Sequence, residues 1–567
     1  MSDDESDAQF FAGAESIAKD DPYVLAQRKK ARIRATLVAL LVLGGALAFF
    51  VVQGQKAAAV ARLMAQTEAL MGTGAYADLR AASQQAATAA ASSDLAPAVY
   101  YVQGLKADLA LWALYTNSQS LSSKAEQMLE AAQVRGPEDT ATVFGEALVA
   151  AFRGKPARAL ELLDSGNAGP KDMWHSVARA EALLRSGDVR GARVALGDCD
   201  AGLCRTWSVR IALENGDWER AKVSADAVVA SRSGHELGRT VQVLATAREL
   251  EPADRIERLQ GYMEETDLPP LMLARVVVSL SRARRRAEGP KRADELLERA
   301  IESTPDATML AREVARTKRF QGYFGAAWNR ADKALRNQPS DSALLTELSA
   351  ALYFNDAADL LEGRLDPARK RGTGDDGVRR AEAISALIRG LSDQAIEGLK
   401  ATSHLGEPGD TDLYLAEAFL QARYYDQAQA VARRAHEAFA ATFGEGSREA
   451  AIAKMYEGVA IGMGGEPKAA EAILKEAYAK DVRTVWGAWL FGRYHLAKGK
   501  KKDAKDAFLL ACHNGQDFAK ACLALADVYD TMTMDKVMRR TQEQARKSYL
   551  RTSPQGWQAQ RVKAALK

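Results

Sequence analysis

The chain has four cysteines, and they fall into two local pairs. Cys512 and Cys522 bound the segment CHNGQDFAKAC, and Cys199 and Cys204 bound the segment CDAGLC. Cysteines bind metals, exchange electrons or form covalent cross-links, and each chemistry favours its own spacing. The surroundings matter as much as the spacing, because disulfides persist only in oxidising compartments.

Zinc binding and redox catalysis are both disfavoured for the pair 512–522. Structural zinc sites favour Cys-x2-4-Cys spacing, and the adjacent Cys512 and His513 point to different faces of a helix. Redox catalysis favours Cys-x-x-Cys, which does not occur in the chain. A disulfide and a pair of free buried thiols therefore remain as alternatives.

Residues 35–52 form an uninterrupted apolar segment, ATLVALLVLGGALAFFVV, of eighteen residues without a charge. As a helix this segment is about 27 Å long, close to the hydrocarbon thickness of a bilayer. Only Lys56 and Arg62 follow it closely, whereas five cations precede it: Arg28, Lys29, Lys30, Arg32 and Arg34. The positive-inside rule therefore places the N-terminus in the cytoplasm and the later chain outside it.

A cleaved signal peptide is the alternative to a transmembrane anchor. Residues 57–59 (Ala-Ala-Ala) resemble a cleavage site, but the region before the apolar segment is too long for a signal peptide. We therefore expect an uncleaved anchor at 35–52, preceded by a mostly disordered cytoplasmic tail at 1–34. This tail is acidic and then basic, and Phe10 and Phe11 are its candidate docking residues.

Small residues recur along the rest of the chain at a period near 34. In RADELLERAIESTPD (292–306), Ala293, Leu297 and Ala300 lie on one face of a predicted helix, and Pro305 ends it. Small residues at such positions let two antiparallel helices approach, while a larger Leu or Phe fills the layer between pairs. A shift of 34 residues takes this set to Ala327, Ala331, Ala334 and Pro339. The same shift takes Ala470, Leu474 and Ala477 to Ala504, Phe508 and Ala511, and Gly458 to Gly492. Ala125, Ala159 and Ala192 follow the period to within one position.

Glycine-containing dipeptides suit the turns between the helices of each predicted pair. They occur at 154–155, 187–188, 216–217 and 499–500. GMGGEP (462–467) is also glycine-rich, but no strand precedes it, as a phosphate-binding loop would require. We therefore expect a turn there as well.

This pattern resembles the tetratricopeptide repeat (TPR) family. The resemblance extends from about residue 57 to about residue 550, in roughly twelve to fourteen helix pairs. It is strong over 269–340 and 411–515, and degenerate elsewhere, where the family's large aromatic residue is mostly replaced. AFLLACHNGQDFAKACLALADVYD (507–530) is also similar to the Sel1-like variant, whose secreted members include some with disulfides between neighbouring helices.

The resemblance implies an all-α fold, an α-solenoid of TPR-like helix pairs preceded by a single transmembrane helix. The expected divisions are 57–265 (degenerate TPR-like repeats), 266–480 (TPR-like repeats), 481–550 (C-terminal TPR/Sel1-like repeats) and 551–567 (a C-terminal tail). Each cysteine pair then flanks a turn between two helices, within bridging distance. Beyond the membrane, in an oxidising compartment, both pairs are expected to form disulfides.

Nothing in the sequence indicates an enzyme, a metal site or a cofactor. No Walker loop, His-Glu-x-x-His or Gly-x-Ser-x-Gly motif occurs, and the histidines at 175, 235, 404, 436, 495 and 513 are scattered. The 77 basic and 74 acidic residues give a net charge of +3, which offers no electrostatic case for nucleic acid.

In the TPR family the first helices line a concave surface that binds peptides or partner domains. Candidate partner contacts here are a basic cluster at a first-helix end and an aromatic-rich first helix, in which at least half of the aromatic residues are expected in the core. The candidates are Arg282, Arg284, Arg285 and Arg286, and Trp486, Trp489 and Tyr494.

The sequence therefore predicts a non-enzymatic scaffold or chaperone-like adaptor, anchored in a bacterial inner membrane with its repeats in the periplasm. Its partners are proteins of an envelope complex. Two other functions remain open: a carbohydrate- or cell-wall-binding or polysaccharide-export scaffold, and an import-receptor-like protein with cytosolic repeats. Reduced cysteines would favour the last.

Overall fold

The structure is a computed structural model that describes residues 22–91, 97–169, 171–197, 199–338, 341–370, 376–403, 407–481, 485–515 and 517–566. The predictions made for Phe10, Phe11, Pro339 and His404 lie outside these residues. The chain divides into two compact units, one ending at Gln66 and one beginning at Thr67.

The first unit is described by most of one long helix, α2 (Pro22–Thr73), which contains the predicted membrane segment. Residues 35–52 of this helix are all exposed. Among the described residues, α2 is the one helix long and apolar enough to cross a membrane; a signal sequence near an N-terminus has the same character.

The second unit is built from thirteen consecutive helix pairs, from α4–α5 to α28–α29, and the described residues contain no β-strand. The first helices are α4 (Ala98–Leu111), α6 (Thr140–Phe152), α8 (Met173–Arg185), α10 (Gly202–Glu214), α12 (Glu236–Arg248), α14 (Pro270–Ala287), α16 (Thr308–Phe320), α18 (Ser342–Phe354), α20 (Asp376–Ile388), α22 (Asp410–Gln421), α24 (Arg448–Met463), α26 (Val485–Ala497) and α28 (Ala519–Asp530).

The second helices are α5 (Gln119–Arg135), α7 (Pro156–Asp164), α9 (Val189–Gly197), α11 (Trp218–Ser231), α13 (Pro252–Glu265), α15 (Pro290–Ser303), α17 (Phe324–Asn337), α19 (Ala358–Lys370), α21 (Ser392–Ala401), α23 (Tyr425–Phe443), α25 (Pro467–Asp481), α27 (Lys501–Asn514) and α29 (Lys536–Thr552). Three elements lie outside the pairs: α3 (Tyr76–Ala91), the π-helical turn η1 (Trp112–Thr116) that continues α4, and α30 (Ala559–Leu566), which folds where the sequence predicted a tail.

The predicted all-α solenoid with a period of 34 is confirmed. First helices begin one such period apart at 202, 236 and 270, again at 308, 342, 376 and 410, and at 485 and 519. Each first helix packs on its own second helix, and most first helices also pack on the first helix of the next pair. The predicted turns between paired helices hold Gly154, Gly187, Gly216 and Gly499, all at positive φ (69° to 85°), where a side chain is disfavoured.

The two kinds of helix are buried very differently. Second helices such as α15 bury one stripe, here Ala293, Leu297, Ala300 and Ile301. Several first helices, such as α18 and α22, are buried on nearly all sides; every residue of α18 from Leu344 to Phe354 is buried. A helix that is apolar all round belongs in the centre of a large core.

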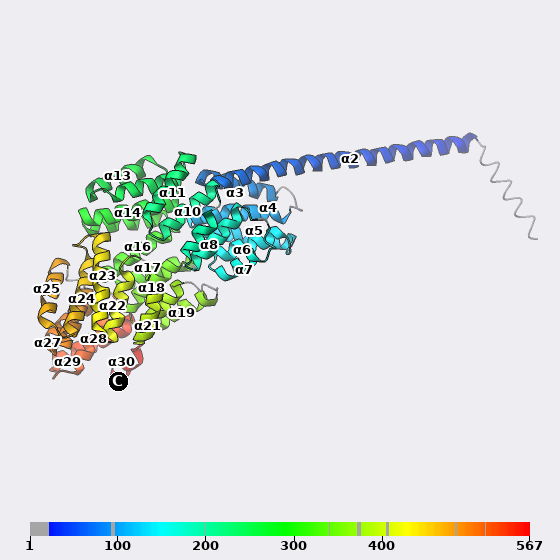
Figure 1. The fold of residues 1–567 in the computed structure, drawn as a ribbon. Coiled ribbons are helices and arrows are strands. Elements are labelled where there is room, and N and C mark those ends of the chain that lie inside the picture. Colours follow the sequence, from blue (N-terminus) through cyan, green and yellow to red (C-terminus); the bar gives the residue numbers. More distant parts are fainter. Residues whose placement is uncertain are drawn as a thin grey trace, which may run out of the picture. The chain divides into compact units, whose positions relative to one another are not determined.

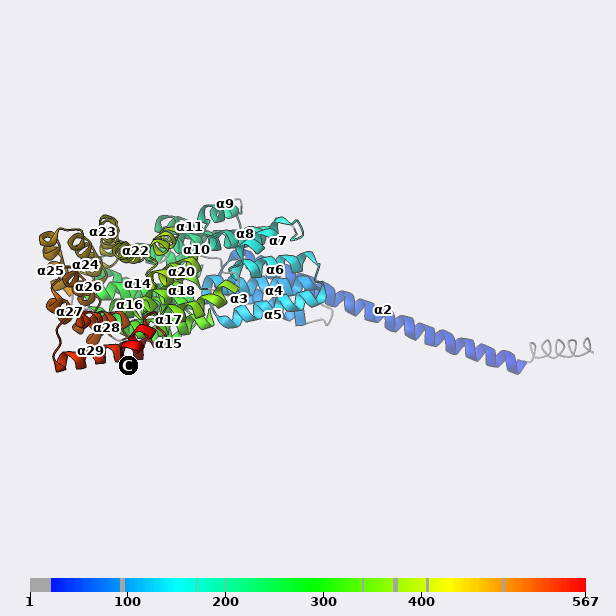
Figure 2. The ribbon, with the colours of Figure 1, turned by 90° about the horizontal axis from the view of Figure 1, so that it is seen from below.

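First helices are surrounded because the solenoid winds back on itself. Both views of the second unit show α22 and α24 returning beside α14, α16 and α18, and Figure 2 shows α26 beside them as well (Figure 1 and Figure 2). The ring centroids of Phe354 and Trp486 lie 4.5 Å apart, and those of Phe324 and Phe518 lie 4.7 Å apart. The expectation of a concave surface open to a partner is therefore corrected: along these helices, later turns of the same chain fill that surface.

Candidate functional site

The polar side chains of the interior form a network of ion pairs, called here the ionic core. It comprises Arg282, Arg285, Arg316 and Arg319 with Glu313, Glu347, Glu407, Asp410 and Glu449. These residues come from α14, α16, α18, α22 and α24 and from the segment before α22. Arg316 and Arg319 are each 1% exposed, so this network is part of the protein's core.

The ionic core joins neighbouring first helices by bidentate pairs. Arg282 of α14 donates to both carboxylate oxygens of Glu313 in α16, at 3.1 and 2.7 Å. Arg319 of α16 does the same to Glu347 in α18, at 2.6 and 3.1 Å. Glu313 and Glu347 are one repeat period apart, but Arg282 and Arg319 are not; the acids therefore recur with the fold, while each takes an arginine at a different repeat position.

The ionic core also joins turns of the superhelix that are far apart in sequence. Arg282 Nη2 donates to Glu407 Oε1 at 2.6 Å, and Arg316 Nη1 donates to Glu449 Oε1 at 3.2 Å. Arg319 lies 3.4 Å from Asp410. Each turn is therefore tied to the next by charge as well as by aromatic packing.

Burial and pairing act in opposite directions on the acids of this network. Burial alone would raise the pKa of Glu313, but Arg282, with Arg316 and Arg285 nearby, outweighs burial and holds that pKa at about 2. The pKa of Glu407 is lowered in the same way, again mainly by Arg282. Both acids are therefore ionised at neutral pH, and their charges are compensated inside the fold.

The four arginines predicted as partner contacts are placed differently from one another. Arg282 and Arg285 belong to the ionic core; Arg285 donates to Thr317 Oγ1 at 2.7 Å and lies 3.4 Å from Asp294. Arg284 lies 3.9 Å from Glu288. Arg286 donates to the backbone oxygen of Ala441 at 3.2 Å and forms no ion pair with a described residue.

The aromatic residues predicted as partner contacts lie in the core. Trp486, Trp489 and Tyr494 are 1%, 5% and 4% exposed. The indole N–H of Trp486 donates to Tyr456 Oη at 3.3 Å, and Tyr494 Oη donates to the oxygen of Pro467 at 3.1 Å. These positions agree with the expectation that at least half of the aromatic residues lie in the core; their role as partner contacts stays a prediction.

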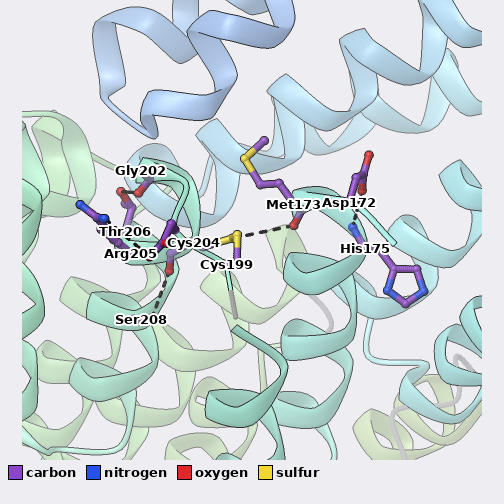
Figure 3. The surroundings of a disulfide bond; sticks show 10 residues. Asp172, Met173, His175, Cys199, Gly202, Cys204, Arg205, Thr206 and Ser208 are labelled. Atoms are coloured by element: carbon purple, nitrogen blue, oxygen red, sulfur yellow. Dashed lines mark hydrogen bonds and ion pairs between the residues drawn. A yellow bond between two sulfur atoms is a disulfide. The ribbon is translucent and has the colours of Figure 1, made fainter. Parts of the chain in front are cut away.

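Cys199 and Cys204 lie at the corner between α9 and α10, as predicted, with their sulfur atoms 2.00 Å apart (Figure 3). Gly202 lies inside this short loop. A Cβ atom at Gly202 would be 2.7 Å from the backbone oxygen of Thr73. The loop between the cysteines is therefore packed directly against the last turn of α2.

Cys512 and Cys522 lie at the end of α27 and in the first turn of α28, also as predicted. Their sulfur atoms are 2.08 Å apart and their Cα atoms 4.7 Å apart. Cys522 packs in one apolar cluster with Tyr549 of α29 and with Ala559 and Val562 of α30. This cysteine pair therefore supports the C-terminal end of the solenoid.

The C-terminal segment closes onto the turn between α18 and α19, a contact called here the C-terminal clasp. Tyr549 Oη donates to Asp356 Oδ2 at 2.6 Å, and the backbone N–H of Trp557 donates to the oxygen of Asp356 at 3.0 Å. Lys520 Nζ lies 3.6 Å from the same carboxylate. Asp356 is 2% exposed, at a φ of 53° that is rare for a residue other than glycine.

Sequence reasoning missed both the ionic core and the C-terminal clasp. A signal for the ionic core was present, because Arg282 and Arg316 are one repeat period apart, as are Arg285 and Arg319. No comparable signal marks the C-terminal clasp. Among the described residues, no group of three or more His, Cys, Asp or Glu side chains is arranged to hold a metal ion.

Comparisons with known proteins add little to this description. No protein-family profile and no curated protein sequence matches the chain. One similar solved structure is the crystal structure of the APC/C hetero-tetramer Cut9-Hcn1, with 17% sequence identity over 83% of this chain and 91% of that chain. The TM-score is 0.39, so this likeness carries no argument. The helix order of the structure itself shows an α-solenoid of TPR-like helix pairs.

Proposed function

We propose that this protein is a membrane-anchored scaffold that holds partner proteins on the non-cytoplasmic face of a bacterial inner membrane. Residues 35–52 span the bilayer, the N-terminus is cytoplasmic, and the solenoid lies in the periplasm. The protein is not an enzyme. Its anchor supplies position and raises the local concentration of whatever the solenoid binds.

The observation that carries the proposal is the joint presence of an exposed apolar helix and two closely placed cysteine pairs. The apolar part of α2 carries exposed Leu41, Leu43, Leu47 and Phe50, each more than 60% exposed. Such a surface costs free energy in water and is stable in lipid. Both sulfur pairs follow this helix in sequence and are ready for an oxidising compartment.

The closed interior supports a scaffold that uses its outer surface. Later helices of the same chain cover the concave face of α14, α16 and α18, so an extended peptide has no groove along these three helices. The solenoid, whose turns are joined by ion pairs and aromatic packing, still offers a large outer surface made of second helices and loops. Partners are therefore expected to bind without the superhelix unwinding.

Two experiments test the proposal. Alkaline phosphatase fused after residue 66 should be active in a bacterial host, because that enzyme requires an oxidising compartment; an inactive fusion would reverse the orientation. A photo-reactive amino acid on the exposed faces of α11 or α15, at Val223 or Arg299, should cross-link distinct envelope proteins. Failure of every exposed position to cross-link would contradict the scaffold.

A further inference from the structure

Three arginines on the neighbouring helices α12, α13 and α14 are called here the arginine cluster. Arg286 belongs to the last turn of α14, Arg248 ends α12, and Arg255 lies in α13. None of the three forms an ion pair with a described carboxylate. They contrast with Arg282 and Arg285, which neighbour Arg286 in sequence and pair inside the ionic core.

Each guanidinium of the arginine cluster is held in place by groups that carry no net charge. Arg255 donates to the backbone oxygens of Ala247, Arg248 and Leu250, at 2.7, 2.7 and 3.0 Å. Arg248 lies over the ring of Trp218, 4.5 Å from its centroid. Helix C-termini favour cations, but these contacts leave three whole positive charges close together.

The proximity of the three charges is reflected in their titration. Partial burial, then Arg282, lower the pKa of Arg248; Glu407 opposes them, and Arg286 adds a smaller lowering. Partial burial, then Arg286 and Arg248, lower the pKa of Arg255. Arg248 and Arg255 therefore both lie close enough to Arg286 to be repelled by its charge, and a bound anion would relieve that repulsion.

The arginine cluster lies where two turns of the superhelix meet. Arg286 reaches from α14 to the oxygen of Ala441 in α23, and a Cβ atom at Gly444 would lie 3.6 Å from Arg286 Nε. A ligand at this place would therefore touch both turns. The three arginines lie on three different helices. Such a spread suits a segment that carries several carboxylates better than it suits a single small anion.

The surroundings favour a protein segment over a membrane surface. Large exposed hydrophobic side chains, which an interfacial site would insert into lipid, are absent from the described residues of α12, α13 and α14. Arginine forks bind carboxylates in bidentate geometry. The remaining donors of Arg248, Arg255 and Arg286 are therefore suited to aspartate and glutamate side chains.

We propose that Arg248, Arg255 and Arg286 form a docking site for an acidic segment of a partner protein. This inference rests on the proposed scaffold function and specifies one of its binding surfaces. Binding should be strongly salt-dependent, because it replaces small counterions with fixed carboxylates.

The test uses the full chain in lipid nanodiscs and a fluorescent octaglutamate peptide with an amidated C-terminus, read by anisotropy. The triple variant R248Q/R255Q/R286Q should bind at least about tenfold more weakly. The double variant R248Q/R286Q keeps the backbone contacts of Arg255, so it tests binding if the triple variant is unstable. The triple variant R539Q/R540Q/R551Q removes the same charge from the exposed face of α29 and should bind like the wild type.

Equal weakening in both triple variants would overturn the site, since only net charge would then matter. Preference of the cluster for phosphatidylglycerol vesicles over octaglutamate, abolished by R248Q/R286Q, would also overturn it in favour of a lipid surface. The experiments distinguish a failure of the proposed scaffold function from a failure of the proposed docking site. If exposed positions cross-link envelope proteins and R248Q/R286Q leaves every cross-link unchanged, the site is wrong and the scaffold stands; if no position cross-links, the scaffold itself fails.

Discussion

Glycines 458 and 492 show how single residues set the repeat. A Cβ atom at Gly458 would lie 2.8 Å from Leu474 Cγ, and one at Gly492 would lie 2.6 Å from Phe508 Cε1. The two glycines are one repeat period apart, and so are the two large residues. In these two pairs, α24–α25 and α26–α27, the first helix thus approaches the second closely because the glycine leaves room for a large apolar residue.

Replacement Gly492→Ala should destabilise the protein by about 1–3 kcal/mol, because the added methyl group overpacks against the buried Phe508 ring. Gly261→Ala is the matched control. Gly261 is also helical but has no atom within 4 Å of an added Cβ, so alanine there should be neutral or stabilising. Chemical denaturation measures both, and equal effects would contradict the packing account.

His235 makes stability depend on pH. It precedes α12, where Nδ1 accepts from the N–H of Gly238 at 3.3 Å, and Nε2 lies 3.0 Å from Thr206 Oγ1. Burial, then Arg232, lower the pKa of His235 to about 4. Between about pH 4 and 6.5 the unfolded chain therefore binds a proton at this residue that the folded chain does not.

Consequently, the stabilisation due to neutral His235 is fully present above about pH 6.5 and is lost as pH falls toward 4, up to about 3 kcal/mol. Asparagine keeps a helix cap without titrating. The difference in unfolding free energy between wild type and His235→Asn should therefore shift in favour of the variant over this window. A difference that stays constant with pH would contradict this role.

Between elements, the ionic core determines which first helices can be neighbours. A buried ion pair adds little net stability, yet removal of one partner is costly because the other charge stays buried and unpaired. The repeated Arg–Glu pairs along α14, α16 and α18 therefore specify alignment more than they add stability. Apolar packing alone would tolerate small slips between these helices.

Glu313→Gln should destabilise the protein by about 1–3 kcal/mol, because Arg282 then loses one of its two carboxylate partners and keeps only Glu407. Glu298→Gln is the matched control, since Glu298 pairs with Arg330 at 2.7 Å but is 37% exposed. That change should cost less than about 1 kcal/mol. Urea denaturation measures the free energy of unfolding of both variants. Equal losses of stability would show that the ionic core contributes no more than an exposed ion pair.

For the whole molecule, sequence reasoning predicted the period, the turn glycines, the cysteine corners and the burial of the aromatic helix. These features depend on contacts within a pair or between adjacent pairs, where spacing in sequence reports spacing in space. Closure of the superhelix was not predictable in this way. It depends on contacts such as Arg316–Glu449, 133 residues apart, which arise from a small rotation accumulated over several pairs.

The C-terminal clasp should contribute to this closure. Tyr549→Phe removes the donor to the buried carboxylate of Asp356 and should cost about 1–3 kcal/mol. Amide exchange at Trp557 and Gln558 should speed up before global unfolding. Tyr424→Phe is the control, because Tyr424 is 46% exposed and should change neither quantity; unchanged exchange in Tyr549→Phe would contradict a closing role.

The redox state of the four cysteines tests the central claim, a scaffold in an oxidising envelope compartment, most directly. Protein from native membranes would be alkylated at lysis and digested without reduction, and its peptides analysed by mass spectrometry. The account predicts peptides linked through Cys199–Cys204 and Cys512–Cys522, with no alkylated cysteine. Recovery of all four cysteines as alkylated free thiols would contradict it and place the solenoid in the cytoplasm.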